Sequence, residues 1–249
     1  MEEPSYRQTF SRDASAARYD EVVYAAGSSA DLLWQVEYKI LRALAADALR
    51  GKPAATYLDF ACGTGRVLSS LEDLAAQAVG IDVSAAMLER ARARCRKATL
   101  ICADITRTNG SLEGQYDLIT SFRFLTNAEP ALRSAALRAL HARLNDGGTL
   151  LINTHGNPWS YRLVLLPYHW LKDRFAGRPL FGYLSNRETR RLLQDAGFRV
   201  EAVIGMGFVP QKLLPVMGAR LAGRIESSLA DAPGVQRFGL NQLFVCRKA

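Results

Sequence analysis

The sequence predicts an α/β protein built on a doubly wound sheet of about seven strands, most of them parallel. Two observations lead to this prediction. From residue 56 onward, short apolar runs alternate with helix-forming segments, and such alternation is typical of parallel strands with helices on both faces. The runs are apolar almost throughout, as strands covered on both sides should be. A chain of 249 residues has room for one sizeable domain.

The individual elements follow in order. Residues 29–50 form an amphipathic helix that begins at a Ser/Asp cap and ends before Gly51 and Pro53. Later helices start at Ser84 and at Pro130, two residue types that favour a helix N-terminus. The expected strands are 56–62, 78–83, 98–104, 116–122, 149–155, 199–205 and 241–247, and the expected helices are 65–77, 84–97, 130–144 and 185–198.

Two segments, 156–183 and 206–238, do not fit the alternation. Both are apolar, contain aromatic residues or Met, and carry scattered Lys and Arg. Loops of this length inside a compact domain usually serve a function. We therefore expect them to be inserted lid segments near a binding site.

Composition narrows the class of protein. The formal net charge is +8, which is compatible with a nucleic-acid, membrane-surface or anionic partner, but equally with an arginine-rich solvated surface. No apolar run reaches 18 residues, and the N-terminal stretch lacks the pattern of a signal peptide. The four cysteines form no CxxC pair and the three histidines have no metal-type spacing. We expect a cytoplasmic protein with reduced thiols and without a metal.

The stretch YLDFACGTGRVL, residues 57–68, carries the strongest functional signal. After Asp59, the small residues Ala61, Gly63 and Gly65 alternate, and such residues let a backbone approach a ligand closely. In an open parallel sheet, ligands bind beyond the carboxyl ends of the strands. A tight turn without a ligand would explain the glycines alone, but Asp82 and Asp104 end the next two strands. Three acids at one edge favour a nucleotide-like ligand, with Asp82 placed to bind ribose hydroxyls.

The same stretch indicates which nucleotide. A dinucleotide site would show G-x-G-x-x-G, whereas the third glycine position is Leu68 here. Asp59 just before the turn suits a cationic or amine-bearing ligand better than a pyrophosphate. S-adenosylmethionine fits, because it carries a sulfonium, an ammonium, a ribose and an adenine.

At this point YLDFACGTGRVL, VGIDVSAAML, ICADIT and YDLITSFRFL resemble, in order and spacing, the motifs of class I S-adenosylmethionine-dependent methyltransferases. The match covers about residues 55–155. The resemblance implies a Rossmann-like sheet whose last strand is antiparallel. It also implies S-adenosyl-L-methionine as cofactor and S-adenosyl-L-homocysteine as product. One departure is that the first glycine of the loop is Ala61, a small replacement that does not put binding in doubt.

The resemblance also assigns roles residue by residue. The glycine-rich loop is expected to cradle the amino acid part of the cofactor, the acid after the second strand to hold the ribose, Met87 to cover the adenine, and the acid after the third strand to read the adenine amine. The full set of expected cofactor-binding residues is Asp59, Ala61, Gly63, Thr64, Gly65, Asp82, Val83, Met87, Asp104, Ile105, Ser121 and Phe122.

These assignments divide one domain, residues 1–249, into parts. We expect a helical cap at 1–50, a cofactor-binding core at 51–155, inserted lid segments at 156–183 and 206–238, and the last helix and strands at 184–205 and 239–249. Tyr6, Tyr19 and Tyr24 of the cap are expected to fold over the cofactor, as N-terminal helices do in many relatives.

Methyl transfer from a sulfonium needs alignment more than activation, with a base only if the nucleophile must lose a proton. His155 at a strand tip is the candidate base and Arg123 the candidate for orienting the acceptor. The alternatives are a turn histidine bonded to backbone and an arginine that braces a loop. Tyr24, Asn127 and His169 are expected to bind the substrate.

The sequence indicates the methyl acceptor less closely than the cofactor. The residues after the fourth strand read SFRF rather than the Asn/Asp-Pro-Pro-aromatic motif of enzymes that methylate base amino groups. We expect O- or N-methylation of a small molecule, such as a secondary metabolite or a modified sugar, and no nucleic-acid partner. Rival interpretations are a lipid or lipid-linked acceptor at the membrane surface, RNA methylation, a non-catalytic binding protein, and an NAD-dependent oxidoreductase.

Overall fold

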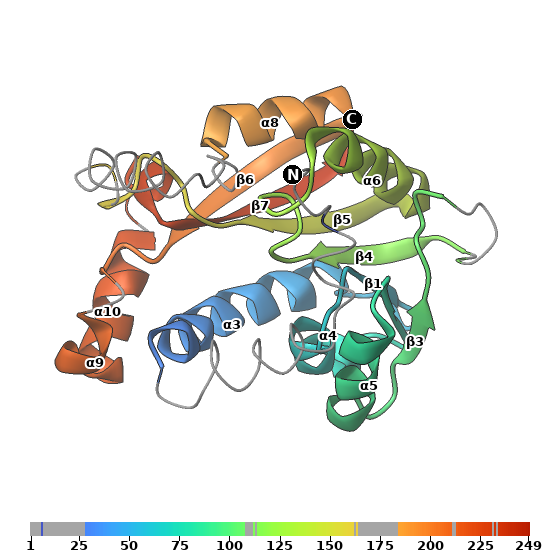
Figure 1. The fold of residues 1–249 in the computed structure, drawn as a ribbon, viewed down its shortest axis with the longest axis horizontal. Coiled ribbons are helices and arrows are strands. Elements are labelled where there is room, and N and C mark those ends of the chain that lie inside the picture. The colour runs from blue at the N-terminus through green and yellow to red at the C-terminus, as the bar shows by residue number, and fades with distance from the viewer. Residues whose placement is uncertain are drawn as a thin grey trace, which may run out of the picture.

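The computed structural model describes residue 6 and residues 28–107, 112, 114–161, 163, 184–210, 213–230, 232 and 234–249. Its centre is one twisted sheet in the order β3-β2-β1-β4-β5-β7-β6 (Figure 1). The strands are β1 (Thr56–Phe60), β2 (Gln77–Asp82), β3 (Thr99–Cys102), β4 (Tyr116–Ser121), β5 (Leu144–Thr154), β6 (Phe198–Met206) and β7 (Asn241–Lys248).

The pairing confirms the predicted sheet. Strands β1 to β5 are parallel to their neighbours, and the last strand, β7, runs antiparallel between β5 and β6. Strand order reverses between β1 and β4, since the chain first builds outward through β2 and β3 and then returns to the other side of β1. The reversal opens a crevice at the carboxyl ends of β1 and β4, where ligands of such sheets bind.

Helices cover both faces of this sheet (Figure 1). On one face lie α3 (Ser29–Ala48), α4 (Arg66–Leu71) and α5 (Ala85–Arg94), and on the other lie α6 (Pro130–Arg143) and α8 (Asn186–Asp195). The short α9 (Leu214–Met217) and the longer α10 (Ala219–Ala230) lie past the end of β6, beside α3. Two 3-10 turns, η2 (Glu72–Leu74) and η4 (Gln236–Phe238), precede β2 and β7.

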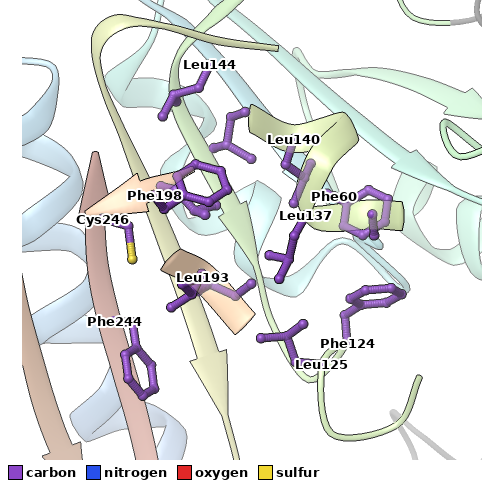
Figure 2. Close-up of a cluster of buried hydrophobic side chains, with 14 of the residues drawn as sticks. Phe60, Phe124, Leu125, Leu137, Leu140, Leu144, Leu193, Phe198, Phe244 and Cys246 are labelled. Carbon is purple, nitrogen blue, oxygen red and sulfur yellow. The ribbon is translucent and has the colours of Figure 1, made fainter. Parts of the chain in front are cut away.

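Alternating strand residues supply two cores, one on each face. Leu58, Ile119 and Ile152 pack with α6 and α8, and Figure 2 shows the aromatic and leucine side chains of that cluster gathered around Leu137, Leu140 and Leu193. Their strand neighbours Tyr57, Leu118 and Leu151 face α3 and α4. Because successive side chains of a strand point to opposite faces, covering both faces requires the continuous apolar runs seen in the sequence.

Three predicted helices end earlier than expected. The helix predicted at 185–198 ends at Asp195, because Gly197 has φ 89° and β6 begins at Phe198. The other two end for a different reason. The helix predicted at 65–77 stops at Leu71 and continues only as η2, and the one predicted at 84–97 stops at Arg94. The cause is Glu72, a buried residue whose carboxylate accepts the backbone N–H groups of Arg96, Lys97 and Ala98 at 2.9–3.1 Å. This side chain ties the turn after α4 to the turn after α5, and both helices end there.

The start of a strand also differs. Residues 145–148, which lie between the predicted helix 130–144 and the predicted strand 149–155, belong to β5, which begins at Leu144. The register of β5 against β4 shifts between Tyr116 and Leu118, so the extra residues are absorbed as an irregularity of the ladder. Within the described part of the chain, no helix combines the length and hydropathy needed to cross a bilayer.

Candidate functional site

Two adjoining cavities lie at the carboxyl edge of β1, β2 and β4. The first, here called the loop cavity, holds about 630 Å³ of empty space including open solvent, and its described lining is Tyr6, Asp59, Ala61, Cys62, Gly63, Thr64, Arg66, Val67, Asp82, Met87, Phe122, Arg123 and Asn127. The second, the β3 cavity, holds about 360 Å³ and is lined by Tyr6, Phe60, Ala61, Ile81, Asp82, Val83, Ala103, Asp104, Thr106, Phe124 and Leu132. The two cavities share the lining residues Tyr6, Ala61 and Asp82 and therefore lie side by side.

The glycine-rich loop uses its small residues for two different purposes. Ala61, Gly63 and Gly65 all have positive φ, at 55°, 54° and 75°. A Cβ added to Gly63 would meet no atom within 4 Å, so this position borders open space. A Cβ on Gly65 would lie 2.9 Å from the Ala91 Cβ. Gly63 therefore leaves room for a ligand, whereas Gly65 allows α5 to pack against the loop.

Asp82, the last residue of β2, joins this loop to the second strand. Its Oδ2 accepts the Gly63 N–H at 2.8 Å and its Oδ1 accepts the Ser84 N–H at 2.9 Å. Burial raises the pKa of the Asp82 carboxyl, while the N–H groups of Ser84, Gly63 and Val83 lower it. The carboxylate lines both cavities and holds the glycine loop in the shape that the cavity requires.

Asp59 is the other carboxylate of the loop cavity, and it is only 1% exposed. Its Oδ1 accepts the Thr120 hydroxyl at 2.6 Å. Its Oδ2 is buried and has no hydrogen-bond partner within the described ranges. Burial raises the pKa of Asp59 to about 7, while Thr120 and the nearby Leu68 N–H lower it. A buried acceptor without a partner is costly, and a cationic group in the cavity would supply that partner.

The residues predicted to surround the adenine are divided between the two cavities and the core. Asp104 and Val83 line the β3 cavity, and Met87 lines the loop cavity. The Asp104 carboxylate accepts the Thr106 N–H and hydroxyl at 2.9 and 2.6 Å. Ile105 packs against the core of the α6 face and is not among the described lining residues of either cavity.

The loop after β4 is held in an unusual conformation. Arg123 has φ 58°, a value that non-glycine residues seldom adopt. Its N–H donates to the Asn153 side chain at 3.2 Å, and its carbonyl accepts the Asn127 side-chain amide at 2.6 Å. Arg123, Asn127 and Phe122 all line the loop cavity. Strained residues fixed by surrounding contacts are frequent at functional sites.

Of the remaining predicted site residues, only Thr64 is among the described lining residues of a cavity. Thr64 lines the loop cavity and accepts two hydrogen bonds from Arg94. Ser121, which is fully buried, and Gly65 are absent from the described linings. The His155 ring contacts the Thr126 hydroxyl, with Nδ1 at 2.7 Å, and is likewise absent from those linings. Tyr24 and His169, like Tyr19, fall outside the described residues.

Some lining residues were not predicted from the sequence. Cys62 lies between the small loop residues, Val67 follows them in α4, and Ala103 precedes Asp104, so their positions beside the motifs were a usable signal. Phe124 was not foreseeable in the same way. Its ring stacks edge-on against Tyr6 at 5.3 Å and Phe60 at 4.9 Å, and only the folded chain brings these three together. The prediction that Tyr6 covers the cofactor site agrees with its place in both cavities.

The donor set of the site contains no cluster suited to a metal. Within the described parts of the chain, no group of three or more His, Cys, Asp and Glu side chains could hold an ion. Instead the site combines two buried carboxylates, an open glycine and aromatic walls. These are the groups that an amine-bearing nucleoside would contact.

Comparison with known proteins identifies the class that this fold and site define. A family model described as a methyltransferase domain matches residues 33–203, more than half of the chain. The chain belongs to this methyltransferase-domain family. The predicted class, a class I S-adenosylmethionine-dependent methyltransferase with a Rossmann-like fold, is thereby confirmed.

Two curated relatives carry names of O-methyltransferases. A malonyl-[acyl-carrier protein] O-methyltransferase of Anoxybacillus flavithermus is 33% identical over 112 residues, 42% of this chain and 40% of that protein. A ubiquinone biosynthesis O-methyltransferase of Pseudomonas paraeruginosa is 24% identical over 173 residues, 66% of this chain and 73% of that protein. The match thus spans less than half of the first relative's length.

Among solved structures, magnesium protoporphyrin IX methyltransferase from Synechocystis, crystallised with bound S-adenosylhomocysteine, has a similar fold. It superposes with a TM-score of 0.65 at 18% identity, over 98% of this chain and 97% of that one. At this identity the likeness shows the fold alone.

Proposed function

We propose that the loop cavity and the β3 cavity together hold S-adenosylmethionine, and that the chain transfers its methyl group to an oxygen atom of a small molecule. The observation that carries the proposal is the pair of buried carboxylates in one cavity. Asp59 presents a buried oxygen without a described partner, and Asp82 already orders the loop through the Gly63 N–H. When bound, the cofactor supplies an activated methyl group.

Each group of residues has a distinct role in this proposal. Asp59 pairs with the ammonium of the cofactor, and Asp82 receives the ribose hydroxyls. Asp104 with Val83 and Met87 borders the adenine. The open Gly63 lets the backbone approach the amino acid part, because a side chain there would occupy the cavity.

The acceptor would enter past Arg123 and Asn127, because these residues, which follow β4, line the loop cavity together with the glycine loop. The fixed backbone of Arg123 places the residue at one position, and alignment of nucleophile and methyl group is the main requirement of this reaction. Oxygen is favoured over nitrogen as nucleophile because both curated relatives are named O-methyltransferases. His155 stays a candidate base, acting from beside Thr126.

The test has two stages. Calorimetric titration with S-adenosylmethionine and S-adenosylhomocysteine should give micromolar binding, and Asp82→Ala should abolish most of it. Methyl-labelled cofactor is then incubated with a panel of phenols, carboxylic acids, sugars and amines. Label on hydroxyl or carboxylate compounds supports O-methylation, and label confined to amines would contradict it. Failure of both cofactor forms to bind would refute the proposed site.

A second candidate function is methylation of a lipid or lipid-linked acceptor. The described parts of the two inserted segments expose large apolar side chains, with Val216 83% exposed and Trp159 57% exposed, together with Leu163, Leu213, Leu221 and Phe238. Such side chains beside basic residues are typical of interfacial segments. Co-sedimentation with vesicles of anionic phospholipid decides: protein that remains in the supernatant at low salt would remove this candidate.

A further inference from the structure

Below Asp59, on the α4 side of the sheet, lies a chain of three hydrogen-bonding side chains. Asp59 of β1 and Thr120 of β4 are direct partners in the parallel ladder. Thr120 donates its hydroxyl to Asp59 Oδ1 at 2.6 Å, and the Tyr57 hydroxyl lies 2.8 Å from the same Thr120 oxygen. All three residues are at most 1% exposed.

The direction of these hydrogen bonds follows from the number of protons. A threonine hydroxyl has one hydrogen, and Thr120 uses it toward the carboxylate. Tyr57 must therefore donate to Thr120. This chain of hydrogen bonds, here called the relay, directs the Thr120 hydroxyl at Oδ1. Oδ2 has no hydrogen-bond partner among the described residues, and Asp59 lines the loop cavity.

We propose that Thr120 and Tyr57 are positioning residues for cofactor binding, which hold the Asp59 carboxylate so that Oδ2 receives the cofactor ammonium. This inference rests on the role of Asp59 proposed above. A carboxylate without the relay could rotate about its side-chain torsions, and it would lose the one strong donor that favours its charged form. The relay both aims Asp59 and helps it to stay ionised in a buried setting.

Because Asp59 is buried among other titratable groups, the effect of the relay can be measured as a pH dependence of cofactor affinity. The described titratable or charged groups that act on it or share its cavity are Tyr6 of the N-terminal segment, Tyr57 from β1, Asp82 from β2, Cys62 and Arg66 from the loop and α4, Cys95 after α5, and Arg123 after β4. Burial raises the pKa of Asp59 to about 7. An ammonium needs the ionised carboxylate, so affinity is full above this pKa and falls as the pH drops through it.

The experiment measures the cofactor dissociation constant of the full chain between pH 5 and 9 by calorimetry. Thr120→Val removes the donor to Oδ1. The acid limb, which is the pH range over which affinity falls as Asp59 is protonated, should therefore move up by about one pH unit. Affinity at pH 6.5 should be about tenfold weaker than in wild type. Thr120→Ser restores the hydroxyl and should return the limb to its place. Tyr57→Phe should move it in the same direction by less.

Thr149→Val is the matched control, because Thr149 is also a buried strand threonine and its hydroxyl has no partner among the described residues. A Thr120→Val profile that superposes on those of wild type and Thr149→Val would overturn the inference. Should Thr120→Val fail to fold by circular dichroism, the Tyr57→Phe profile decides, and one identical to wild type overturns it. Asp59→Asn separates the two proposals: undiminished binding by that variant refutes the role of Asp59 itself.

Discussion

The loop after β1 and the loop after β4 both border the loop cavity, yet they are built in opposite ways. The first uses small residues and exposes its backbone at Gly63, whereas the second presents the large side chains of Phe122 and Arg123. Each contains one non-glycine residue at positive φ, Ala61 and Arg123. On the function proposed above, the first loop binds the methyl donor through close approach of its main chain, and the second binds the acceptor through its side chains.

The largest effect is expected where the first loop is held in shape. Asp82→Ala removes both the proposed ribose acceptor and the acceptor of the Gly63 N–H. Loss of two charge-assisted hydrogen bonds should weaken cofactor binding on the order of 100-fold or more. Calorimetric titration measures it, with the exposed Glu89→Ala as control. A dissociation constant within threefold of wild type would disprove the role of Asp82.

A pair of glycine variants separates ligand space from packing. Gly65→Ala places a Cβ against Ala91 at positive φ and should lower the free energy of unfolding by about 2–4 kcal/mol. Gly63→Ala should lower the free energy of unfolding by only about 1–2 kcal/mol, the cost of a left-handed backbone at alanine. Its methyl group enters the cavity, however, and should weaken cofactor binding at least as much as Gly65→Ala does. Denaturant unfolding and titration of both variants should show this crossed pattern. Equal losses of stability would contradict it.

The second loop should respond in turnover rather than in cofactor affinity. Arg123→Ala keeps the cofactor contacts of the first loop, so the dissociation constant should change less than threefold, while kcat/KM for the acceptor should fall about tenfold or more. Arg123→Lys is the control for charge without the planar guanidinium. If cofactor affinity falls as much as kcat/KM, the division between donor loop and acceptor loop is wrong.

His155 provides a smaller test of the same division. His155→Ala should reduce kcat and leave cofactor affinity near that of wild type, since the ring lies against Thr126 and not among the described cavity linings. The pH profile of kcat distinguishes a base from a structural residue, because removal of a base should abolish the limb near the pKa of histidine. Unchanged turnover would remove His155 as a base.

The smallest effect is expected from relieving the strained residue of the first loop. Ala61→Gly removes a left-handed alanine at φ 55°, and the gain is partly offset by the greater freedom of glycine in the unfolded chain. A net gain of about 0.5 kcal/mol is expected. Thermal unfolding of the variant measures it, and a clear loss of stability would show that the Ala61 methyl group contributes packing of its own.

The sequence alone predicted residues of both loops, but not the backbone conformation of the second. Asp59, Gly63 and Asp82 lie in short stretches that can be interpreted from neighbouring residues alone, namely an apolar run, a turn made of small residues and an acid at a strand end. All three line the loop cavity. The places of Arg123 and Asn127 there were also expected, but not the left-handed backbone that holds them, because that conformation depends on Asn153 from the neighbouring strand.

What the sequence by itself determined is the succession of strands, turns and helices and the edge at which the acids gather, because periodicity, caps and glycine turns act over a few residues. What only the tertiary structure decided is which side chains meet there. Thr120 reaches Asp59 across 61 positions of chain, and Tyr6 stacks on Phe124 from the far N-terminus. Such contacts depend on strand register and packing, which the whole core sets at once.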